Sequence, residues 1–213
     1  MAFTYFFRDN QSLEMIRDHV LPVIGCRRYI DIWSAGCAMG QEPYTIAILL
    51  RENMGPMIFR NVRIFCTDID TSNLFKRIIK EGRYPRKELD RIPREIFAKY
   101  FSVDDERPGY YKIAPEIKKP ISFEKHDLLT FRPVRQNLGL VVCKNVLLHF
   151  SEEERLKVLA MFYHALDDNG FLLMEQTQKM PPGMENHFAP VAANAQIFRK
   201  IPGKDNPLRV SPS

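Results

Sequence analysis

Cysteine is scarce in this chain of 213 residues, which contains four cysteines and no Cys-x-x-Cys pair. Zinc sites usually contain such pairs, and disulfide frameworks place many cysteines in a short secreted chain, so neither is predicted. We expect the three thiols that lie at or just after predicted strands to pack as small apolar groups. Reduced thiols fit a reducing compartment, so the expected location is the cytoplasm.

Long apolar runs are also missing. A helix that spans a bilayer needs about 20 consecutive apolar residues, and the chain has no such run. Arg8 and Asp9 interrupt the segment where a signal peptide would require an apolar stretch. We therefore expect no insertion into a membrane.

The chain lacks a strong excess of either charge, because 31 Lys and Arg residues oppose 26 Asp and Glu residues, for a net charge of +5. Its densest basic group, residues 83–94, is interrupted by acids. Nucleic-acid binders carry a basic patch on one face, so nucleic acid is disfavoured as a partner. The mild positive charge permits attraction to an acidic protein surface.

The most informative stretch lies between residues 29 and 44. Residues 29–33 predict a buried strand, Gly36 and Gly40 flank a loop of small residues, and Pro43 stands near the first turn of a helix. A strand, a glycine turn and a helix N-terminus place backbone N–H groups beside a ligand. A tight turn without a ligand would also explain two glycines.

A second predicted strand, residues 62–67, is followed by Asp68 and Asp70. In dinucleotide-binding folds an acid at this place binds the ribose hydroxyls. The alternative is capping of a helix that we expect over residues 71–80. Asp70 or Thr71 suits the cap, which leaves Asp68 for a ligand.

Five segments together resemble the chemotaxis-type (CheR-like) methyltransferase family, whose members use S-adenosylmethionine to methylate glutamate side chains of chemoreceptors. In the family's order they are residues 4–8, 33–44, 67–71, 123–129 and 142–150. The resemblance extends to about residue 201. Members usually carry a helical domain before the first motif, whereas this sequence starts almost at that motif.

The resemblance implies an α/β fold, with a Rossmann-like class I methyltransferase sheet over residues 1–202. It also implies a small inserted antiparallel β-subdomain at 82–123. Beyond the resemblance, residues 203–213 are expected to form a disordered tail. In some members this subdomain holds a receptor peptide, and pairing along an edge strand would be the physical mode. A lid without a role in recruitment is the alternative.

The resemblance also implies a set of site residues, with S-adenosylmethionine as cofactor, S-adenosylhomocysteine as product and no metal. Glu42 would meet the cofactor's cationic amino group, and Arg8 would face both cofactor and acceptor. Arg8 and His149 are the candidate catalytic residues. The candidate cofactor-binding residues are Thr4, Arg8, Gly36, Glu42, Asp68, Asp127, Leu128, Cys143 and Lys144.

Several residues depart from the family's usual pattern. Lys144 replaces an arginine, Asp127 replaces an asparagine, and His149 replaces a tyrosine that faces the substrate. Histidine adds a titratable base, which a carboxylate acceptor does not need because it is already ionised at pH 7. This favours an acceptor other than the usual receptor glutamate. Helix capping or packing on Phe150 would explain His149 equally well.

The predicted activity is direct methyl transfer to an acceptor protein, either chemoreceptor-like or another signalling protein. Two alternatives remain open: a methyltransferase that acts on a small molecule or nucleic acid, and a cofactor-binding module without turnover. The pattern makes no prediction of the oligomeric state.

Other elements are predicted from local signals. We expect a helix over residues 10–21 closed by Pro22, and a capping box formed by Ser151 and Glu154. Strands are expected at 138–143, 171–175 and, antiparallel, 195–199. Residues 176–189 are expected to form a mobile loop.

Overall fold

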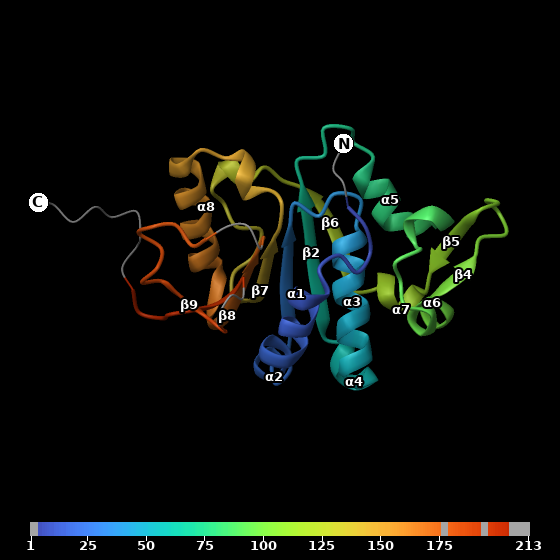
Figure 1. The fold of residues 1–213 in the computed structure, drawn as a ribbon, viewed down its shortest axis with the longest axis horizontal. Helices are drawn as coiled ribbons and strands as arrows, with labels where there is room; N and C mark the ends of the chain where they lie inside the picture. The colour runs from blue at the N-terminus through green and yellow to red at the C-terminus, as the bar shows by residue number, and fades with distance from the viewer. Residues whose placement is uncertain (1–3, 176–178, 193–195, 205–213) are drawn as a thin grey trace, which may run out of the picture.

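The computed structural model describes residues 4–175, 179–192 and 196–204. Within these residues the chain forms a seven-stranded sheet and a separate three-stranded sheet (Figure 1). The strands of the large sheet, in spatial order, are β6 (Ile121–Lys125), β2 (Val62–Asp68), β1 (Ile30–Ala35), β7 (Leu138–Cys143), β8 (Leu166–Met174), β10 (Ile197–Lys200) and β9 (Phe188–Pro190).

Helices connect these strands, and some of them cover the large sheet. The α-helices are α1 (Asn10–Met15), α2 (Leu21–Ile24), α3 (Gln41–Asn53), α4 (Pro56–Phe59), α5 (Phe75–Glu81), α6 (Arg94–Tyr100), α7 (Pro115–Lys118) and α8 (Glu152–Ala165). The shorter helical turns are η1 (Ile16–Val20), η2 (Arg86–Glu88), η3 (Leu128–Thr130) and η4 (Leu147–His149).

The pairing between strands sets where a ligand site can form. β6, β2, β1, β7 and β8 are parallel, whereas β10 pairs antiparallel with both β8 and β9. From β1 the chain moves outward to β2 and β6, then crosses to β7 on the other side of β1. Open α/β sheets bind ligands at the carboxyl ends of strands beside such a switch point. The parallel α/β sheet predicted from the sequence is confirmed.

The central strands of the large sheet are buried on both faces, so residues on opposite faces of one strand enter different cores. Ile30 and Ile32 of β1 pack in a cluster that includes α3 and η1, whereas Trp33 and Ala35 pack in a cluster that includes α8. Figure 1 shows α1, α2 and α3 in front of the sheet. Strands buried on both faces are apolar throughout, as β7 is with all six residues buried.

The first helical segment is longer than predicted. Pro22 was expected to end the helix at residue 21, but helical backbone continues through α2 to Ile24. The π turn Ile16–Val20 precedes the proline. A proline ring clashes with the carbonyl four residues earlier in a regular helix, and a wider turn relieves that clash.

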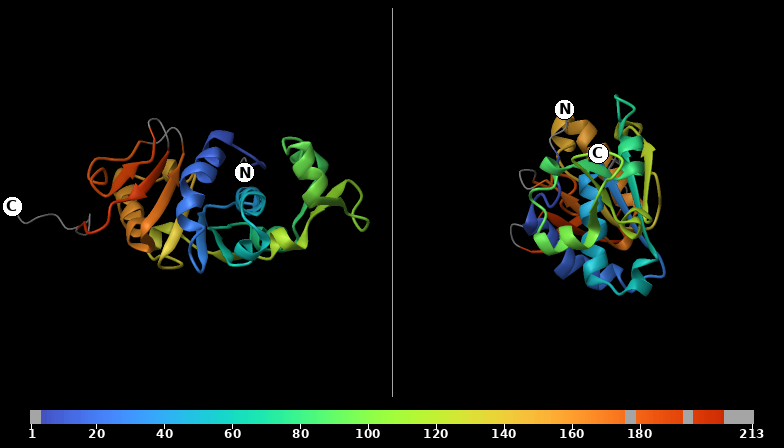
Figure 2. Two further views of the ribbon diagram at one scale, coloured as in Figure 1. Left: turned by 90° about the horizontal axis from the view of Figure 1, so that it is seen from below. Right: turned by 90° about the vertical axis from the view of Figure 1, so that its right-hand side faces the viewer.

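The small sheet belongs to the inserted segment and has the order β3 (Arg83–Pro85), β5 (Tyr110–Ile113) and β4 (Phe101–Val103), all antiparallel. Figure 2 shows this region at one end of an elongated molecule. An antiparallel sheet in this insert is therefore confirmed.

The predicted range of that subdomain, 82–123, ends too late. Its last expected strand is β6, which pairs parallel with β2 from Ile64–Ile121 to Asp68–Lys125 and so belongs to the large sheet. The short alternating pattern of residues 121–123 predicts a strand but contains nothing that selects one sheet over the other.

Side-chain caps start two of the helices, as predicted. The Ser151 and Glu154 capping box is present at the start of α8. The helix expected from residue 71 begins at Phe75, because the Asp70 carboxylate accepts from the Leu74 and Phe75 N–H groups at 3.1 Å each. Asp70 therefore supports the start of this helix, which confirms the capping role that was the alternative to ligand binding.

The last predicted strands are present with shifted bounds. β8 begins at Leu166, ahead of the expected residue 171, and β10 runs antiparallel to it as predicted. β9 begins inside the segment expected to be a loop. Residues 176–178 of that loop, residue 195 of the last strand and residues 205–213 of the predicted tail lie outside the described residues.

Candidate active site

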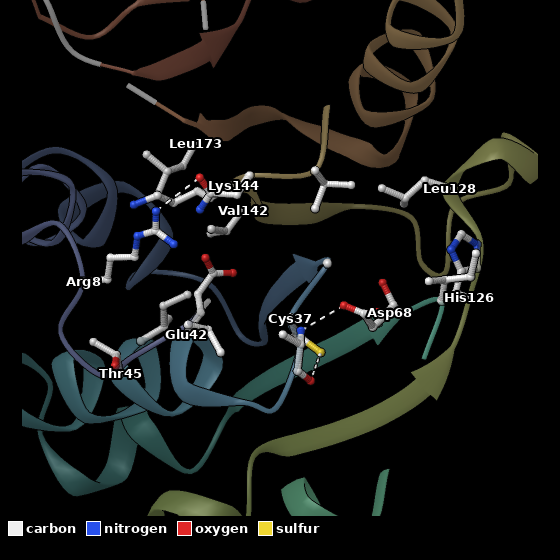
Figure 3. Close-up of a pocket in the computed structure, with 18 of the residues that line it drawn as sticks. Arg8, Cys37, Glu42, Thr45, Asp68, His126, Leu128, Val142, Lys144 and Leu173 are labelled. Carbon is white, nitrogen blue, oxygen red and sulfur yellow. Dashed lines mark hydrogen bonds between the residues drawn. The ribbon is translucent and has the colours of Figure 1, made fainter. Parts of the chain in front are cut away.

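A cavity of about 610 Å³ opens at the carboxyl ends of β1, β2 and β7. Figure 3 shows it enclosed by segments that are far apart in the sequence. They are the N-terminal residues, the β1–α3 loop, the end of β2, the segment after β6 and the segment after β7. A volume in this range accommodates a cofactor-sized molecule.

The β1–α3 loop is braced by the end of β2. The Gly36 and Cys37 N–H groups both donate to the Thr67 carbonyl, at 2.8 and 3.0 Å. Gly36 has φ +84°, and a Cβ there would lie 2.1 Å from Val146 Cγ2. Glycine is therefore required both for the backbone conformation and for space. These two N–H groups already donate within the protein. We therefore expect the loop to contribute to ligand binding through the close approach of its backbone.

Asp68 both supports this loop and faces the cavity. One carboxylate oxygen accepts from the Ala38 N–H at 2.9 Å and the other accepts from the Asp70 N–H at 3.1 Å. Figure 3 shows the carboxylate at the cavity edge beside Cys37. Each carboxylate oxygen can accept more than one hydrogen bond. The group can therefore bind hydroxyls while it holds the loop.

Glu42 lies on the first turn of α3 and points into the cavity (Figure 3). Enclosure by protein raises the pKa of its carboxyl, while a 2.7 Å hydrogen bond from the Ser34 hydroxyl and the positive charges of Lys144 and Arg8 oppose the rise. Ionisation is thus less favourable here than in water, even with these two cations nearby. A cationic group bound in the cavity would stabilise the carboxylate.

The N-terminal segment forms the opposite wall. Thr4, Tyr5 and Arg8 line the cavity. The Arg8 guanidinium donates to Asn145 Oδ1 at 3.4 Å and lies 5.6 Å from the centre of the Tyr5 ring. Arg91, from the inserted segment, lies 3.9 Å from the same ring centre. The insert therefore contacts the segment that carries Arg8.

The segments after β6 and β7 complete the lining. Asp127 is exposed and accepts from the Leu129 N–H at 2.9 Å, which caps η3, and the neighbouring Leu128 is buried. His149 ends η4, lines the cavity and is exposed. These positions give the cavity an apolar wall at Leu128 and an open, polar edge at His149.

The structure brings nearly all the predicted site residues together. Those that line the cavity are Thr4, Arg8, Gly36, Glu42, Asp68, Asp127, Leu128, Lys144 and His149. Cys143 does not line it. Its side chain is fully buried in the core that faces α8, which raises the pKa of the thiol. The alternation of β7 points this residue away from the cavity and Val142 towards it.

Three residues that hold site side chains in place were not predicted from the sequence. Ser34 donates to Glu42, Asn145 accepts from Arg8, and Asp9 forms a 2.8 Å ion pair with Lys144. Most of these contacts join segments more than 100 residues apart. Local sequence patterns cannot predict contacts between such distant segments. The one available signal is that Asn145, with φ 59°, follows a strand end, and asparagine is enriched at such left-handed positions.

The parallel sheet order and a cavity at its switch point define a Rossmann-like α/β protein with a nucleotide-type ligand site. Residues 2–197 match the model of the family "CheR methyltransferase, SAM binding domain". The chain belongs to this family, whose domain binds S-adenosylmethionine. The family predicted from the five motifs is therefore confirmed.

Curated relatives of this chain carry names that agree with this family. The chain is 30% identical over 202 residues to a chemotaxis protein methyltransferase of Vibrio parahaemolyticus, covering 93% of this chain and 72% of that protein. It is also 30% identical over 184 residues to one of Borreliella burgdorferi, covering 82% of this chain and 63% of that protein. The chain thus spans about two thirds of the length of these relatives.

Among solved structures, PKMT2 from Rickettsia typhi aligns with a TM-score of 0.48 at 14% identity, over 87% of this chain and 28% of that one. No helix among the residues that the structure describes is both long enough and apolar enough to cross a bilayer.

Proposed function

We propose that this chain transfers the methyl group of S-adenosylmethionine to a protein side chain, as its chemotaxis relatives are named for doing. The observation that carries the proposal is the joint presence of Arg8, Glu42 and Asp68 on one cavity at the switch point. A chemoreceptor-like or other signalling protein is the proposed acceptor. The four free cysteines fit action in a reducing cytoplasm.

The residues present fit the cofactor. Glu42 offers a carboxylate whose ionisation is favoured by a cation, which suits the methionyl amino group. Asp68 offers oxygens for the ribose hydroxyls, and the buried Leu128 offers an apolar surface for the adenine. Gly36 lets the loop that lines the cavity pass close to Val146, where a Cβ would strike that side chain. Arg8 would pair with a carboxylate of the cofactor or the acceptor.

When bound, the cofactor supplies a methyl group activated by a positively charged sulfur. The task of this chain is to hold the acceptor atom in line with that methyl group and to exclude water. Arg8 would orient the acceptor, and His149 would border it at the open edge of the cavity. An acceptor carboxylate is ionised at neutral pH and needs no base, whereas an alcohol or amine would release a proton to one.

His149 supports a specific version of the proposal, in which the acceptor differs from the receptor glutamate that the family resemblance implies. Its side chain lines the cavity where it can reach an acceptor. The N–H of His149 donates to the Val146 carbonyl at 3.0 Å within η4, and the side chain does not cap α8, because Ser151 does so. The capping explanation for His149 therefore loses support, while packing on Phe150 remains.

The first test is calorimetric titration of the full chain with S-adenosylhomocysteine, in parallel with Asp68→Ala. Binding by the wild type and strong loss in the variant would support the cofactor site. If the wild type does not bind, the proposed activity is wrong for this chain.

The second test incubates the chain with radiolabelled S-adenosylmethionine and candidate acceptor proteins. Label that alkali releases as volatile methanol identifies a carboxylate ester, and alkali-stable label identifies transfer to nitrogen or an ether oxygen. Transfer only to a small molecule or to RNA would replace the protein acceptor. Tight binding without transfer to any acceptor would favour a binding module.

A further inference from the structure

Residues 7–9 cross the cavity wall in a conformation that local preferences do not favour. Phe7 and Asp9, on either side of Arg8, have φ angles of 54° and 63°. This left-handed region is unfavourable for a residue such as Phe7, although Asp adopts it more readily than most side chains do. Contacts with other parts of the fold must therefore hold the segment, and with it the direction of the Arg8 side chain.

Two segments supply such contacts. The Phe7 N–H donates to Thr45 Oγ1 of α3 at 3.1 Å, and Arg8 donates to Asn145 Oδ1 at 3.4 Å. Next to Asn145, Lys144 Nζ lies 2.8 Å from Asp9 Oδ2, with side chains only 7% and 14% exposed. A short, charged and nearly buried contact fixes geometry more firmly than a long hydrogen bond does.

Asp9 connects this ion pair to the helix that follows. Its carboxylate accepts from the Ser12 N–H at 3.2 Å and also from the Ser12 hydroxyl, which starts α1. Ser12, Leu13 and Ile16 line the same cavity. The Lys144–Asp9 pair therefore joins the end of β7 to the entire N-terminal wall, immediately beside Arg8.

We propose that Lys144 is a positioning residue, which acts through Asp9 to hold Arg8 against the cavity, and that Asp9 is its necessary partner. This reassigns Lys144 from the direct cofactor contact that the sequence predicts. The inference rests on the proposed function, because it takes Arg8 as a residue that meets the cofactor.

A double-mutant cycle separates positioning from direct contact. The dissociation constant for S-adenosylhomocysteine is measured by calorimetry for the wild type, Asp9→Asn, Lys144→Met and the double variant. Each single change should weaken binding about tenfold, because the guanidinium is no longer pre-organised. The double variant should bind no more weakly than either single variant, since both changes remove the same pair.

A direct contact would give a different pattern. If Lys144 touches the cofactor, Lys144→Met should weaken binding further in the Asp9→Asn background, and that result would overturn the inference. In an Arg8→Gln background, the Asp9 change should have little further effect, because its contribution passes through Arg8. A loss of the full size in that background would also contradict it.

Two further variants separate a loss of binding from a loss of folding. Lys144→Arg retains a cation for Asp9 and should bind S-adenosylhomocysteine within about threefold of the wild type. A loss as large as that of Lys144→Met would count against the pair. If Lys144→Met does not fold, the same cycle is run with Lys144→Gln, which keeps a hydrogen-bond donor.

The wild-type titration distinguishes the two proposals. Absence of binding by the wild type would defeat the proposed function. Binding by the wild type together with additive single changes would defeat only the positioning role.

Discussion

The two ends of the cavity differ in how firmly their side chains are held. At the end that we assign to the cofactor, Asp68 and Glu42 each have a hydrogen bond of 2.9 Å or less to a neighbouring segment. At the acceptor end His149 is exposed, and the adjacent Leu148 is 47% exposed. A pre-organised site gains affinity because little ordering is left to occur on binding. The acceptor end therefore leaves room for the acceptor itself to complete the site.

The largest expected effect is at Gly36, and Gly109 provides a matched control. Both have positive φ, +84° and +80°, but only Gly36 has a neighbour that a Cβ would strike. Gly36→Ala should lower the free energy of unfolding by roughly 2–4 kcal/mol and abolish measurable S-adenosylhomocysteine binding. Gly109→Ala should lower it by about 1 kcal/mol, from backbone strain alone, and leave binding intact.

Urea unfolding and calorimetry measure both Gly variants. A second control, Gly36→Ala combined with Val146→Ala, removes the methyl group at 2.1 Å and should recover part of the lost stability. Equal losses in the two single variants would show that the close approach at Gly36 is unimportant.

The next largest effect is expected at Asp68. Asp68→Ala should weaken S-adenosylhomocysteine binding about 100-fold, because it removes the ribose partner and also the acceptor for the Ala38 N–H. Asp68→Asn keeps the shape and should weaken binding by a smaller factor, about tenfold. Calorimetry measures both. If Asp68→Ala lowers stability but leaves the affinity unchanged, Asp68 only supports the loop and does not bind the ribose.

Glu42 should show opposite effects on stability and binding. Enclosure raises the pKa of its carboxyl above the ordinary 4.5. A raised pKa contributes stability that is fully present below pH 4.5 and is lost as the pH rises through the folded-state value. Without ligand, Glu42→Gln should therefore gain stability relative to the wild type as the pH rises above 4.5.

Urea unfolding from pH 4.5 to 8 tests this sign. Binding of S-adenosylhomocysteine should be weaker in Glu42→Gln, and wild-type affinity should increase with pH as the carboxyl ionises to meet the amino group. A stability difference that stays constant across this range would mean that Glu42 ionises without hindrance.

The smallest effect on cofactor affinity is expected at His149, which tests the open end. His149→Phe should leave S-adenosylhomocysteine affinity unchanged and stability within about 0.5 kcal/mol. If the side chain serves as a base, the variant should lose the pH dependence of methyl transfer between about pH 5 and 8. A rate that is the same for both proteins across that range would remove the base hypothesis.

Much of the site was predictable because its residues stand at the ends of buried strands. Apolar segments such as residues 138–143 identify parallel strands, and the residues that follow them meet at one edge of the sheet. Gly36 and Asp68 were predicted in this way and line the cavity, as does Lys144, which the family resemblance implied. Cys143 was not separable from its neighbours, because only the twist and register of β7 decide which face it occupies.

The sequence by itself determined the local elements and the family: the strand, the glycine loop, the capping box of α8 and the five motifs are all short-range patterns. Only the tertiary structure decided that β6 joins the large sheet and that Asp9 pairs with Lys144 across 135 residues. The physical reason is the distance along the chain over which each interaction acts. Propensity and capping act within a few residues of the chain, whereas sheet partners and buried ion pairs are selected by which distant segments the packed core brings together.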